Sequence, residues 1–404
     1  MNILRAFIPA LLPLLFIPSS VAGSNFETIY SSSGTYPIGL TYANGALFGV
    51  SDSGALEDIS CGSVFELQPP AVAGDAWTET TLYSFDISTD GCGPSFAPVT
   101  GPSGEIYGVT SGGGAYNSGA VYELQPPASP GEAWTERVLY SLGAPAGNIG
   151  FEDGPLLPGP DGSFFLLNTG GVRGSLGGLV HVLPPASPGG DWTGNLVYSF
   201  PEYTLADSLV SGPNGVFYGT TLYGATPGGG VFQLTPPSAP GEAWTYTELY
   251  NLPIERGVTL NSLTVDTDGT IYGTAYGFSN YGTGPGFVFS LTPPAAAGGN
   301  WAFTLLKNFG GYHPDQTLII HDGNLYGAIA SNHDGGVFEL QPPAAPGGEW
   351  AFTFLHSFTG TQATSGTSYT GGAFVMDPKG TIYGATQNYY AEPVTGTVYQ
   401  FATQ

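Results

Sequence analysis

The chain is dominated by one repeating unit, and this repeat limits the possible folds more than any other feature. Each copy contains an apolar segment, a turn ending in Gly, the motif [FY]-G-x-[TS], a Gly-rich loop, V-[FY]-x-L, a Pro pair, a Trp and a segment like L-Y-S-F. The copies are spaced by 49 to 59 residues. The Pro pairs begin at Pro69, Pro126, Pro184, Pro236, Pro293 and Pro342, and the tryptophans are Trp77, Trp134, Trp192, Trp244, Trp301 and Trp350. A fixed period of this length indicates a repeat architecture.

Each unit predicts four short β-strands, because it contains four apolar runs that alternate with period two. The aromatic-Gly marks of the second strand lie at Phe48, Tyr107, Tyr218, Tyr272, Tyr326 and Tyr383, with a degenerate seventh copy at Phe165-Leu166. Tight Gly-Pro-x-Gly turns, such as residues 101–104 and 212–215, join the first and second strands. The Pro pair removes two backbone donors after the third strand, so strand pairing stops there.

The two ends of the repeat region complement one another. The last unit stops at residues 397–402, which form a third strand without a Trp-bearing fourth strand behind it. Residues 25–31 resemble residues 77–84 and therefore form a fourth strand with no unit of its own. We expect an all-β fold, a single seven-bladed β-propeller over residues 23–404, closed by the N-terminal strand completing the last blade. A linear array is the alternative, but it would expose a bare sheet edge at each end.

The composition excludes several classes of protein. The chain has 404 residues, of which 41% are hydrophobic and 13% aromatic, so it can bury enough apolar surface to fold. Charged residues make up only 9%, too few to solvate long helical faces. The net charge of -25 disfavours nucleic acid and anionic membranes as partners. No phosphate-binding loop or other cofactor motif is present in the sequence, so we expect no cofactor.

Residues 1–22 read as a secretory signal peptide, with Arg5 followed by an apolar run and small residues before a cleavage site near Ala22. We therefore expect a secreted protein, extracellular or periplasmic, without a membrane span and monomeric. Cys61 and Cys92 are the two cysteines, and an exported protein favours a disulfide between them. Two cysteines alone have neither the number nor the spacing of a metal site, and we expect no metal.

The predicted topology places two kinds of loop on one face of the ring. The connections from second to third strand and from each fourth strand to the next blade share the face that we call the top, and the other turns share the bottom. The candidate residues of the top loops are His313, His333, Asp315, Asp334, Arg173, Arg256, Tyr276, Tyr281, Tyr389 and Tyr390. Variable loops on a rigid scaffold are where binding and catalysis are usually found.

These residues support two hypotheses. Aromatic rings that stack on sugar faces favour a binding module for extracellular glycans or cell-envelope ligands. The alternative is a polysaccharide lyase or hydrolase that uses His313, His333 or Tyr281 as base, with Arg173 and Arg256 neutralising a substrate carboxylate. The simpler interpretation, that these loop residues are unrelated groups on a polar surface, is favoured over a shared site. A metal site at His313, Asp315 and His333 is less favoured still.

Several polar residues have structural interpretations. His321 occupies a bottom turn, away from the top group, while His181 and His356 occupy strand positions. The variable position of V-[FY]-x-L holds Glu66, Glu123, His181, Gln233, Ser290, Glu339 and Gln400. No single reaction would tolerate that variety, so we interpret this position as solvated or hydrogen-bonded.

The repeat resembles the GloVer (Gloeo/Verruco) family of secreted tandem-repeat proteins, whose unit has the same Tyr-Gly-Thr, Gly-rich, Val-Phe-x-Leu and Leu-Tyr-Ser-Phe order. The resemblance covers nearly all of the predicted mature chain and implies an exported propeller. It provides no catalytic residues to transfer. Members of that family often end in an anchoring segment, whereas this chain ends at Gln404 directly after a predicted strand. We therefore expect no surface anchor of that type.

Overall fold

The computed structural model describes most of the chain from Phe26 onward. The described residues are 26–33, 35–53, 61–72, 74–86, 90–129, 131–143, 154–168, 177–187, 189–201, 204–223, 229–239, 241–252, 258–277, 286–296, 298–314, 317–330, 335–345, 347–358, 374–388 and 395–403. The predicted signal peptide therefore lies outside the described residues. No helix in these ranges is long and apolar enough to cross a membrane.

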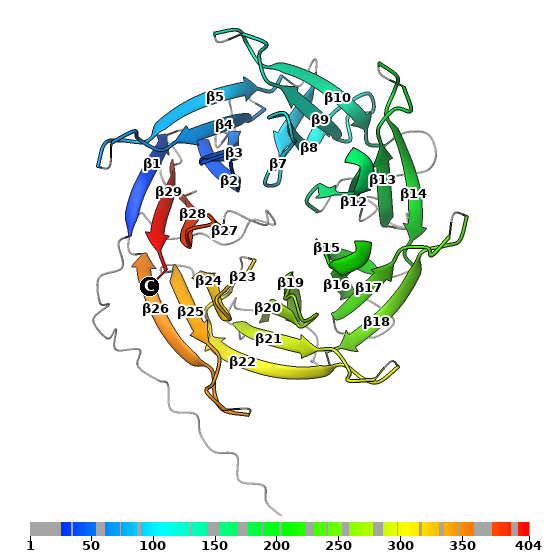
Figure 1. The fold of residues 1–404 in the computed structure, drawn as a ribbon, viewed down its shortest axis with the longest axis vertical. Helices are drawn as coiled ribbons and strands as arrows, with labels where there is room; N and C mark the ends of the chain where they lie inside the picture. The colour runs from blue at the N-terminus through cyan, green and yellow to red at the C-terminus, as the bar shows by residue number, and fades with distance from the viewer. Residues whose placement is uncertain are drawn as a thin grey trace, which may run out of the picture.

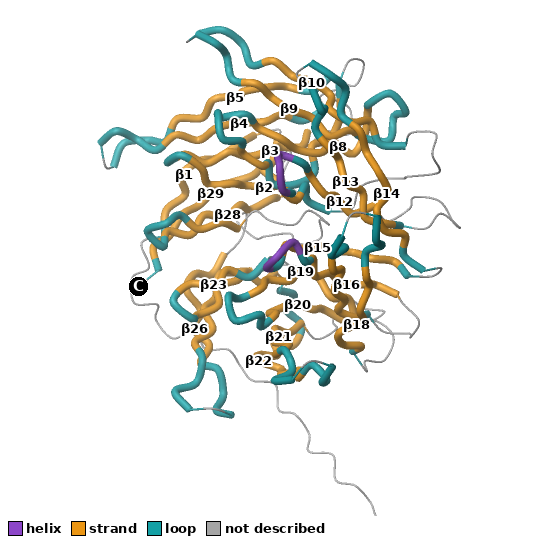
Figure 2. Tube along the Cα trace, turned by 45° about the vertical axis from the view of Figure 1, so that its right-hand side comes forward, coloured by secondary structure: helices purple, strands orange, loops and turns teal. Residues whose placement is uncertain are grey.

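Seven antiparallel sheets surround a central axis, so the protein is a seven-bladed β-propeller, as predicted (Figure 1). In each blade the innermost strand is followed outward by the second, third and fourth strands, which we call a to d. Short helical turns appear in two of the inner hairpins (purple in Figure 2). These are η1 (Pro160–Gly162) in blade 3 and η2 (Pro213–Gly215) in blade 4.

The first four blades are built as follows. Blade 1 contains β2 (Thr35–Ala43), β3 (Ala46–Ser53), β4 (Ser63–Gln68) and β5 (Thr78–Ser84). Blade 2 contains a divided inner strand, β6 (Gly91–Pro94) and β7 (Val99–Thr100), then β8 (Ile106–Gly113), β9 (Ala120–Gln125) and β10 (Thr135–Ser141). Blade 3 contains β11 (Leu157–Pro158), β12 (Phe164–Asn168), β13 (Gly178–Leu183) and β14 (Thr193–Ser199). Blade 4 contains β15 (Leu205–Ser211), β16 (Phe217–Tyr223), β17 (Gly230–Thr235) and β18 (Thr245–Asn251).

The remaining blades complete the ring. Blade 5 contains β19 (Val258–Val265), β20 (Ile271–Gly277), β21 (Gly286–Thr292) and β22 (Ala302–Gly310). Blade 6 contains β23 (Ile319–His321), β24 (Asn324–Ala330), β25 (Gly335–Gln341) and β26 (Ala351–Phe358). Blade 7 contains β27 (Phe374–Met376), β28 (Thr381–Asn388), β29 (Thr395–Ala402) and, as its outer strand, β1 (Glu27–Ser33).

The N-terminal strand closes the ring. β1 pairs antiparallel with β29, from Glu27 opposite Gln400 to Ser33 opposite Thr395, and the blue and red strands lie side by side in Figure 1. A side-chain contact reinforces the pairing, since Gln400 Nε2 donates to Glu27 Oε2 at 2.8 Å. The first and last described strands of the chain therefore share one blade, and the linear-array alternative is excluded.

The hydrophobic core is divided into layers that lie between neighbouring blades. The layer between blades 1 and 2, for example, joins Val50 and Val64 to Ile106 and Tyr122. Equivalent layers lie between every other pair of neighbours, including blades 7 and 1. Each blade is covered on both faces only when both neighbours are present.

The glycine of the [FY]-G motif is explained by a ring lying across it. Gly49 pairs directly with Phe65, and a Cβ at Gly49 would lie 2.3 Å from Phe65 Cζ. Five other blades repeat this arrangement, with Gly108, Gly219, Gly273, Gly327 and Gly384 facing Tyr122, Phe232, Phe289, Phe338 and Tyr399. Blade 3 reverses the sizes, because Leu166 faces Val180. The degenerate copy therefore conserves volume across the pair rather than losing it.

The tryptophans connect neighbouring blades. Trp77 of blade 1 contacts Tyr383 of blade 7 at 5.9 Å between ring centroids. Trp244, Trp301 and Trp350 make the same contact with the strand-b aromatic residue of the preceding blade, at Phe165, Tyr218 and Tyr272 respectively. Trp134 and Trp192 pack in the corresponding core layers. The Trp of each repeat is thus an inter-blade contact, which burial of its large ring stabilises.

Candidate functional site

The top face is formed where strand b ends, strand c begins and strand d leads to the next blade. Two of the predicted site residues meet there at the junction of blades 5 and 6. Tyr276 is near the end of β20, and His313 lies in the connection from β22 to β23. Their rings are stacked, with centroids 5.2 Å apart and an interplanar angle of 24°. The structure therefore brings together two candidates that are 37 residues apart in sequence.

Close packing holds the connection that carries His313 in place. A Cβ at Gly286, the first residue of β21, would lie 2.0 Å from the Tyr312 carbonyl oxygen and 2.6 Å from Pro314 Cδ. Asn261 Nδ2 of β19 donates to the Pro314 carbonyl oxygen at 3.3 Å. Gly286 is required because the connection crosses directly over it, and Asn261 holds the connection from β19, the innermost strand of the same blade.

The environment of His313 keeps its imidazole neutral at pH 7. Burial lowers the pKa of His313 below its usual value, because water no longer solvates the charged form. Its Nε2 atom is buried and has no hydrogen-bond partner among the described residues. The ring as a whole is only half-buried, as is that of Tyr276. The pair therefore presents aromatic surface to solvent, while one ring nitrogen points into the protein.

The other predicted site residues lie outside the described residues. These are Arg173, Arg256, Tyr281, Asp315, His333, Asp334, Tyr389 and Tyr390. The strands on either side of these loops are described, and their place on the top face remains the prediction made from the sequence. Whether their side chains converge on Tyr276 and His313 stays a prediction.

The predicted disulfide is present. Cys61 and Cys92 are joined, with their Cα atoms 4.4 Å apart. Cys61 precedes β4 of blade 1 and Cys92 lies in β6 of blade 2, so the bond crosses an inter-blade junction on the top side. Gly93 N donates to the Cys61 carbonyl oxygen at 2.8 Å beside it. The disulfide thus acts as a covalent link between two blades.

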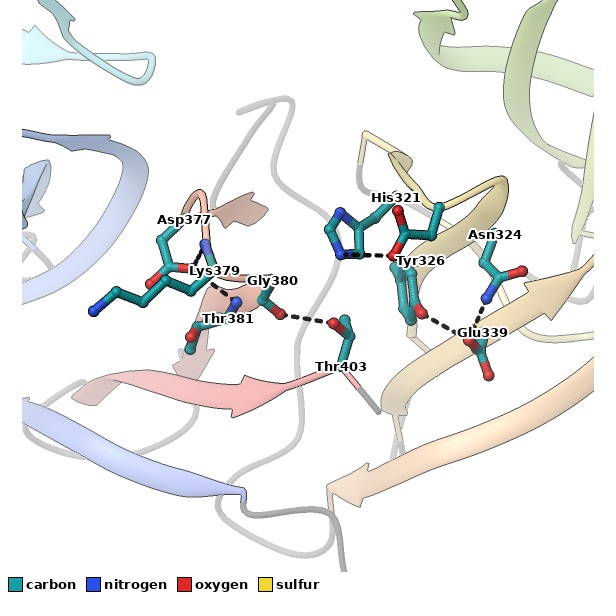
Figure 3. A network of polar contacts seen from close by, with 10 residues as sticks. His321, Asn324, Tyr326, Glu339, Asp377, Lys379, Gly380, Thr381 and Thr403 are labelled. Carbon is teal, nitrogen blue, oxygen red and sulfur yellow. Dashed lines mark hydrogen bonds and ion pairs between the residues drawn. The ribbon is translucent and has the colours of Figure 1, made fainter.

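His321 lies on the opposite face, in the inner hairpin of blade 6, as predicted (Figure 3). Its Nε2 is 3.6 Å from Asp322 Oδ2. Next to it, the hairpin of blade 7 is fixed by Asp377, whose carboxylate accepts from the backbone N–H groups of Lys379 and Thr381, each at 2.8 Å. These contacts satisfy turn backbone groups, and His321 does not join the top-face pair.

The variable position of V-[FY]-x-L is hydrogen-bonded, as predicted. Glu339 Oε1 accepts from the Tyr326 hydroxyl at 2.7 Å and from Asn324 Nδ2 at 2.9 Å, as Figure 3 shows. Glu123 accepts from the Tyr107 hydroxyl at 3.1 Å. His181 Nε2 lies 2.9 Å from Ser163 Oγ, and its ring stacks on Phe165. These residues are part of the blade structure.

One top-face residue was not among the sequence-predicted candidates. Tyr116 lies in the loop between β8 and β9 of blade 2, and 48% of its surface is exposed. The signal was available in the sequence, since Tyr116 follows three glycines between strands b and c. It adds an exposed ring to the face that carries Tyr276.

No metal-binding group was found within the described ranges: no three or more His, Cys, Asp or Glu side chains lie close enough there to hold an ion. The described top-face rings of Tyr276, His313 and Tyr116 offer stacking and hydrogen bonding.

Comparison with known proteins identifies the fold and no family. No family model and no curated protein matches the chain. Among solved structures, a PL25 ulvan lyase bound to -[GlcA(1-4)Rha3S]- is similar with a TM-score of 0.59 and 10% identity, over 92% of this chain and 94% of that one. The polysaccharide lyase Uly1 has a TM-score of 0.54 and 12% identity, over 91% and 90%. A puromycin-hydrolyzing peptidase from Mycobacterium tuberculosis has a TM-score of 0.52 and 12% identity, over 87% and 49%. Identities this low concern the fold alone.

Proposed function

We propose that this protein is an exported β-propeller that binds extracellular glycans or related cell-envelope ligands through its top face. Tyr276 and His313 form part of the binding surface. Membership of the GloVer family belongs to the same proposal.

The stacked pair of Tyr276 and His313 is the observation that carries this proposal. Half-buried aromatic rings held by a fixed connection are suited to packing against the apolar face of a sugar ring. A neutral His313 can stack without the cost of desolvating a charge. Because its Nε2 is buried, a bound substrate has no access to that nitrogen as a proton acceptor. This arrangement favours binding over catalysis by His313.

Two further observations support the proposal. The inter-blade disulfide fits an oxidising, extracytoplasmic environment. Two of the solved structures with a similar ring are polysaccharide lyases, one of them with a bound oligosaccharide. A seven-bladed ring is therefore compatible with glycan ligands, although fold alone does not determine function.

A polysaccharide lyase or hydrolase is the second candidate. It is favoured by the neutral imidazole beside a tyrosine, since these are the residue types that abstract protons near neutral pH. An enzyme of this kind needs a base that the substrate can reach, and His333 or Tyr281 would take that role. Arg173 and Arg256 would then bind a substrate carboxylate.

One experiment separates the two functions. The folded protein is screened against acidic and neutral polysaccharides, recording both retention in affinity electrophoresis and the ultraviolet absorbance of an unsaturated product. Tyr276→Ala and His313→Phe are then compared with His321→Phe on the bottom face. For a binding surface, Tyr276→Ala weakens binding about tenfold, while His313→Phe retains it because a ring remains.

Other outcomes would overturn the proposal. Chain cleavage by the wild-type protein, with an unsaturated or hydrolysed product, would establish the enzyme instead. Failure to retain any polysaccharide, or equal weakening by His321→Phe, would show that the top face is not a glycan site.

A further inference from the structure

The outer strands of neighbouring blades meet at one repeated position around the ring. The residue at the Tyr position of L-Y-S-F on one blade faces the residue two positions after the Trp on the next blade, or its equivalent, Phe26, in blade 7. Rings stack at Tyr198 and Tyr246, at Tyr250 and Phe303, and at His356 and Phe26. Lys307 lies over Phe352, and Gly194 makes room for the ring of Tyr140. We call each of these contacts an outer junction.

Two outer junctions hold a carboxyl group instead. Glu136 occupies the position facing Tyr83 between blades 1 and 2, and Glu79 faces Tyr30 between blades 7 and 1. They differ in their surroundings, because a second acid, Asp90, lies at the junction of Glu136. Asp90 is 3% exposed, accepts from the Tyr83 hydroxyl, and accepts from Asp86 N at 3.2 Å.

Glu136 lacks a compensating partner in this cluster. Its Oε1 atom is buried with no hydrogen bond, and so is the hydroxyl of Tyr122, a residue that is only 1% exposed. The titratable groups that act on this cluster are Asp90, Asp86, Tyr83 and Tyr122. The neighbouring Arg137 instead interacts with Glu123 at 4.0 Å and the Gly190 carbonyl oxygen at 3.5 Å. Glu136 is half-buried, with its Oε1 atom buried among acids and phenols and no cation beside it in the described part of the chain, so its charged form is costly.

We propose that Glu136 is a proton-binding site in the folded protein, and that release of its proton loosens the outer junction between blades 1 and 2. Protonation removes the repulsion from Asp90 and supplies an O–H donor in a cluster that has a buried phenol oxygen to accept it. The site binds only a proton, so no covalent bond is formed or broken.

The direction of the pH effect follows from the electrostatics. Burial, and then the charge of Asp90, raises the pKa of Glu136 to about 7. A carboxyl whose pKa is higher in the folded state contributes its stability below the unfolded value and loses it as the pH rises through the folded value. The junction is therefore tight in mild acid and weakens as the pH passes about 7.

The disulfide reports on this junction. Cys92 is two residues from Asp90, Cys61 is 3% exposed, and the hydrogen bond from Gly93 N to the Cys61 carbonyl oxygen crosses between the same two blades. Loosening the junction breaks that hydrogen bond and admits a reductant to the sulfur atoms. The rate of disulfide reduction therefore measures how often the junction opens.

The test measures reduction of Cys61–Cys92 in the intact protein by a trialkylphosphine between pH about 5.5 and about 8.5. Each rate is divided by the rate for the urea-unfolded protein at the same pH, which removes the pH dependence of the reagent. The wild-type ratio is expected to rise about tenfold over this range. For Glu136→Gln, which mimics the protonated acid, the ratio is expected to change by no more than about twofold over the same pH range.

Glu79→Gln is the matched control, because it removes an acid from the same position of another outer junction. The ratio of reduction rates for Glu79→Gln is expected to rise with pH as it does for the wild type. Glu136→Met provides a second variant without a titrating group if Glu136→Gln does not fold. A flat wild-type profile, a rise that survives in the Glu136 variants, or a rise that is also lost in Glu79→Gln would each overturn the proposal.

Discussion

His356 shows how one side chain links closure of the ring to pH. Its ring stacks on Phe26, with centroids 3.5 Å apart and planes 2° apart, and contacts Phe358 edge-on. Its Nε2 is buried and unpartnered within the described part of the chain, and burial lowers the pKa of the imidazole. Protonation would place a charge against the strand that seals blade 7. This closing contact therefore favours the neutral ring.

We predict that His356→Phe reduces the loss of stability in acid. A histidine whose pKa is lowered in the folded state stabilises the protein above its unfolded pKa of about 6.5 and loses this contribution as the pH falls through the folded value. Phe keeps the stack and cannot be protonated. The check is the free energy of unfolding in urea at pH about 7.5 and about 4.5.

The comparison uses the difference between variant and wild type, because Glu136 acts in the opposite direction over the same range. His321→Phe, in the bottom turn, is the control and should lose stability in acid as the wild type does. An equal acid loss in His356→Phe and the wild type would contradict the prediction.

Sequence reasoning located the candidate residues better than it described their chemistry. Strand order alone predicts His313 and Tyr276 on one face and His321 on the other, and the structure stacks the rings of His313 and Tyr276. The buried Nε2 of His313 and the acidic surroundings of Glu136 were not predicted. Both depend on which neighbouring blade covers a side chain, and a linear pattern within one repeat does not contain that information.

At the scale of the strand, one repeated feature cannot be read from the sequence pattern. In all seven blades the pairing of strands c and d shifts by one residue, for example between Thr81 and Tyr83, which pair with Phe65 and Val64. The unpaired residue is the Leu of L-Y-S-F or its equivalent, such as Leu82, Leu139 and Leu306. A bulge breaks the period-two alternation, so Leu139 and Leu306 are buried beside the junction residues that follow them. Alternation alone predicts the strand but not this break.

The facing pair of Gly49 and Phe65 can be exchanged for the pair used by blade 3. We predict that Gly49→Leu alone destabilises the protein by about 3 kcal/mol through overpacking, and Phe65→Val alone by about 2 to 3 kcal/mol through a cavity. Together they reproduce Leu166 facing Val180, so the double variant should recover about 1 to 3 kcal/mol relative to the sum. A double-mutant cycle from urea unfolding measures this coupling. Strict additivity would show that the two side chains do not share one space.

At the scale of the molecule, the disulfide links blades rather than strands of one blade. Its loop spans 31 residues. Replacing both cysteines by Ala is expected to lower the free energy of unfolding by about 3 to 4 kcal/mol, because the bond restricts the conformational freedom of the unfolded chain. Urea unfolding of the oxidised wild type and the double variant measures this loss. The reduced wild type is the control and should match the variant. No change in stability would mean that the junction is held by its other contacts.

The ring closure can be tested by moving the closing strand. A chain that starts at Thr35 and carries residues 26–33 after Gln404 through a short linker should fold, because Glu27 already pairs with Gln400 beside the C-terminus. Its stability should lie within about 1 kcal/mol of the wild type. A chain that simply lacks residues 26–33 should leave the edge of β29 bare and self-associate. Circular dichroism, unfolding and light scattering measure these outcomes, and a soluble, stable deletion variant would contradict the prediction.

The architecture itself was predictable, since the complementary ends of the repeat region were visible as residues 25–31 and 397–402. Pairing of β1 with β29 confirms that prediction. The degenerate copy at Phe165-Leu166, in blade 3, is only a mismatch in the sequence, because its explanation lies in Val180 on the next strand. The repeat pattern therefore allows the closed ring to be predicted from the sequence. Compensating changes between paired strands become visible only in the folded protein.

The pairing of β1 with β29 also has a consequence for quality control during biosynthesis. A polypeptide interrupted before its final strand, or clipped behind its first, cannot satisfy the hydrogen-bonding edge that remains. Every such fragment stays marked by that edge and by uncovered aromatic surface, which proteases and chaperones recognise. Completion of the propeller is in this way checked by the fold itself, when β1 pairs with β29.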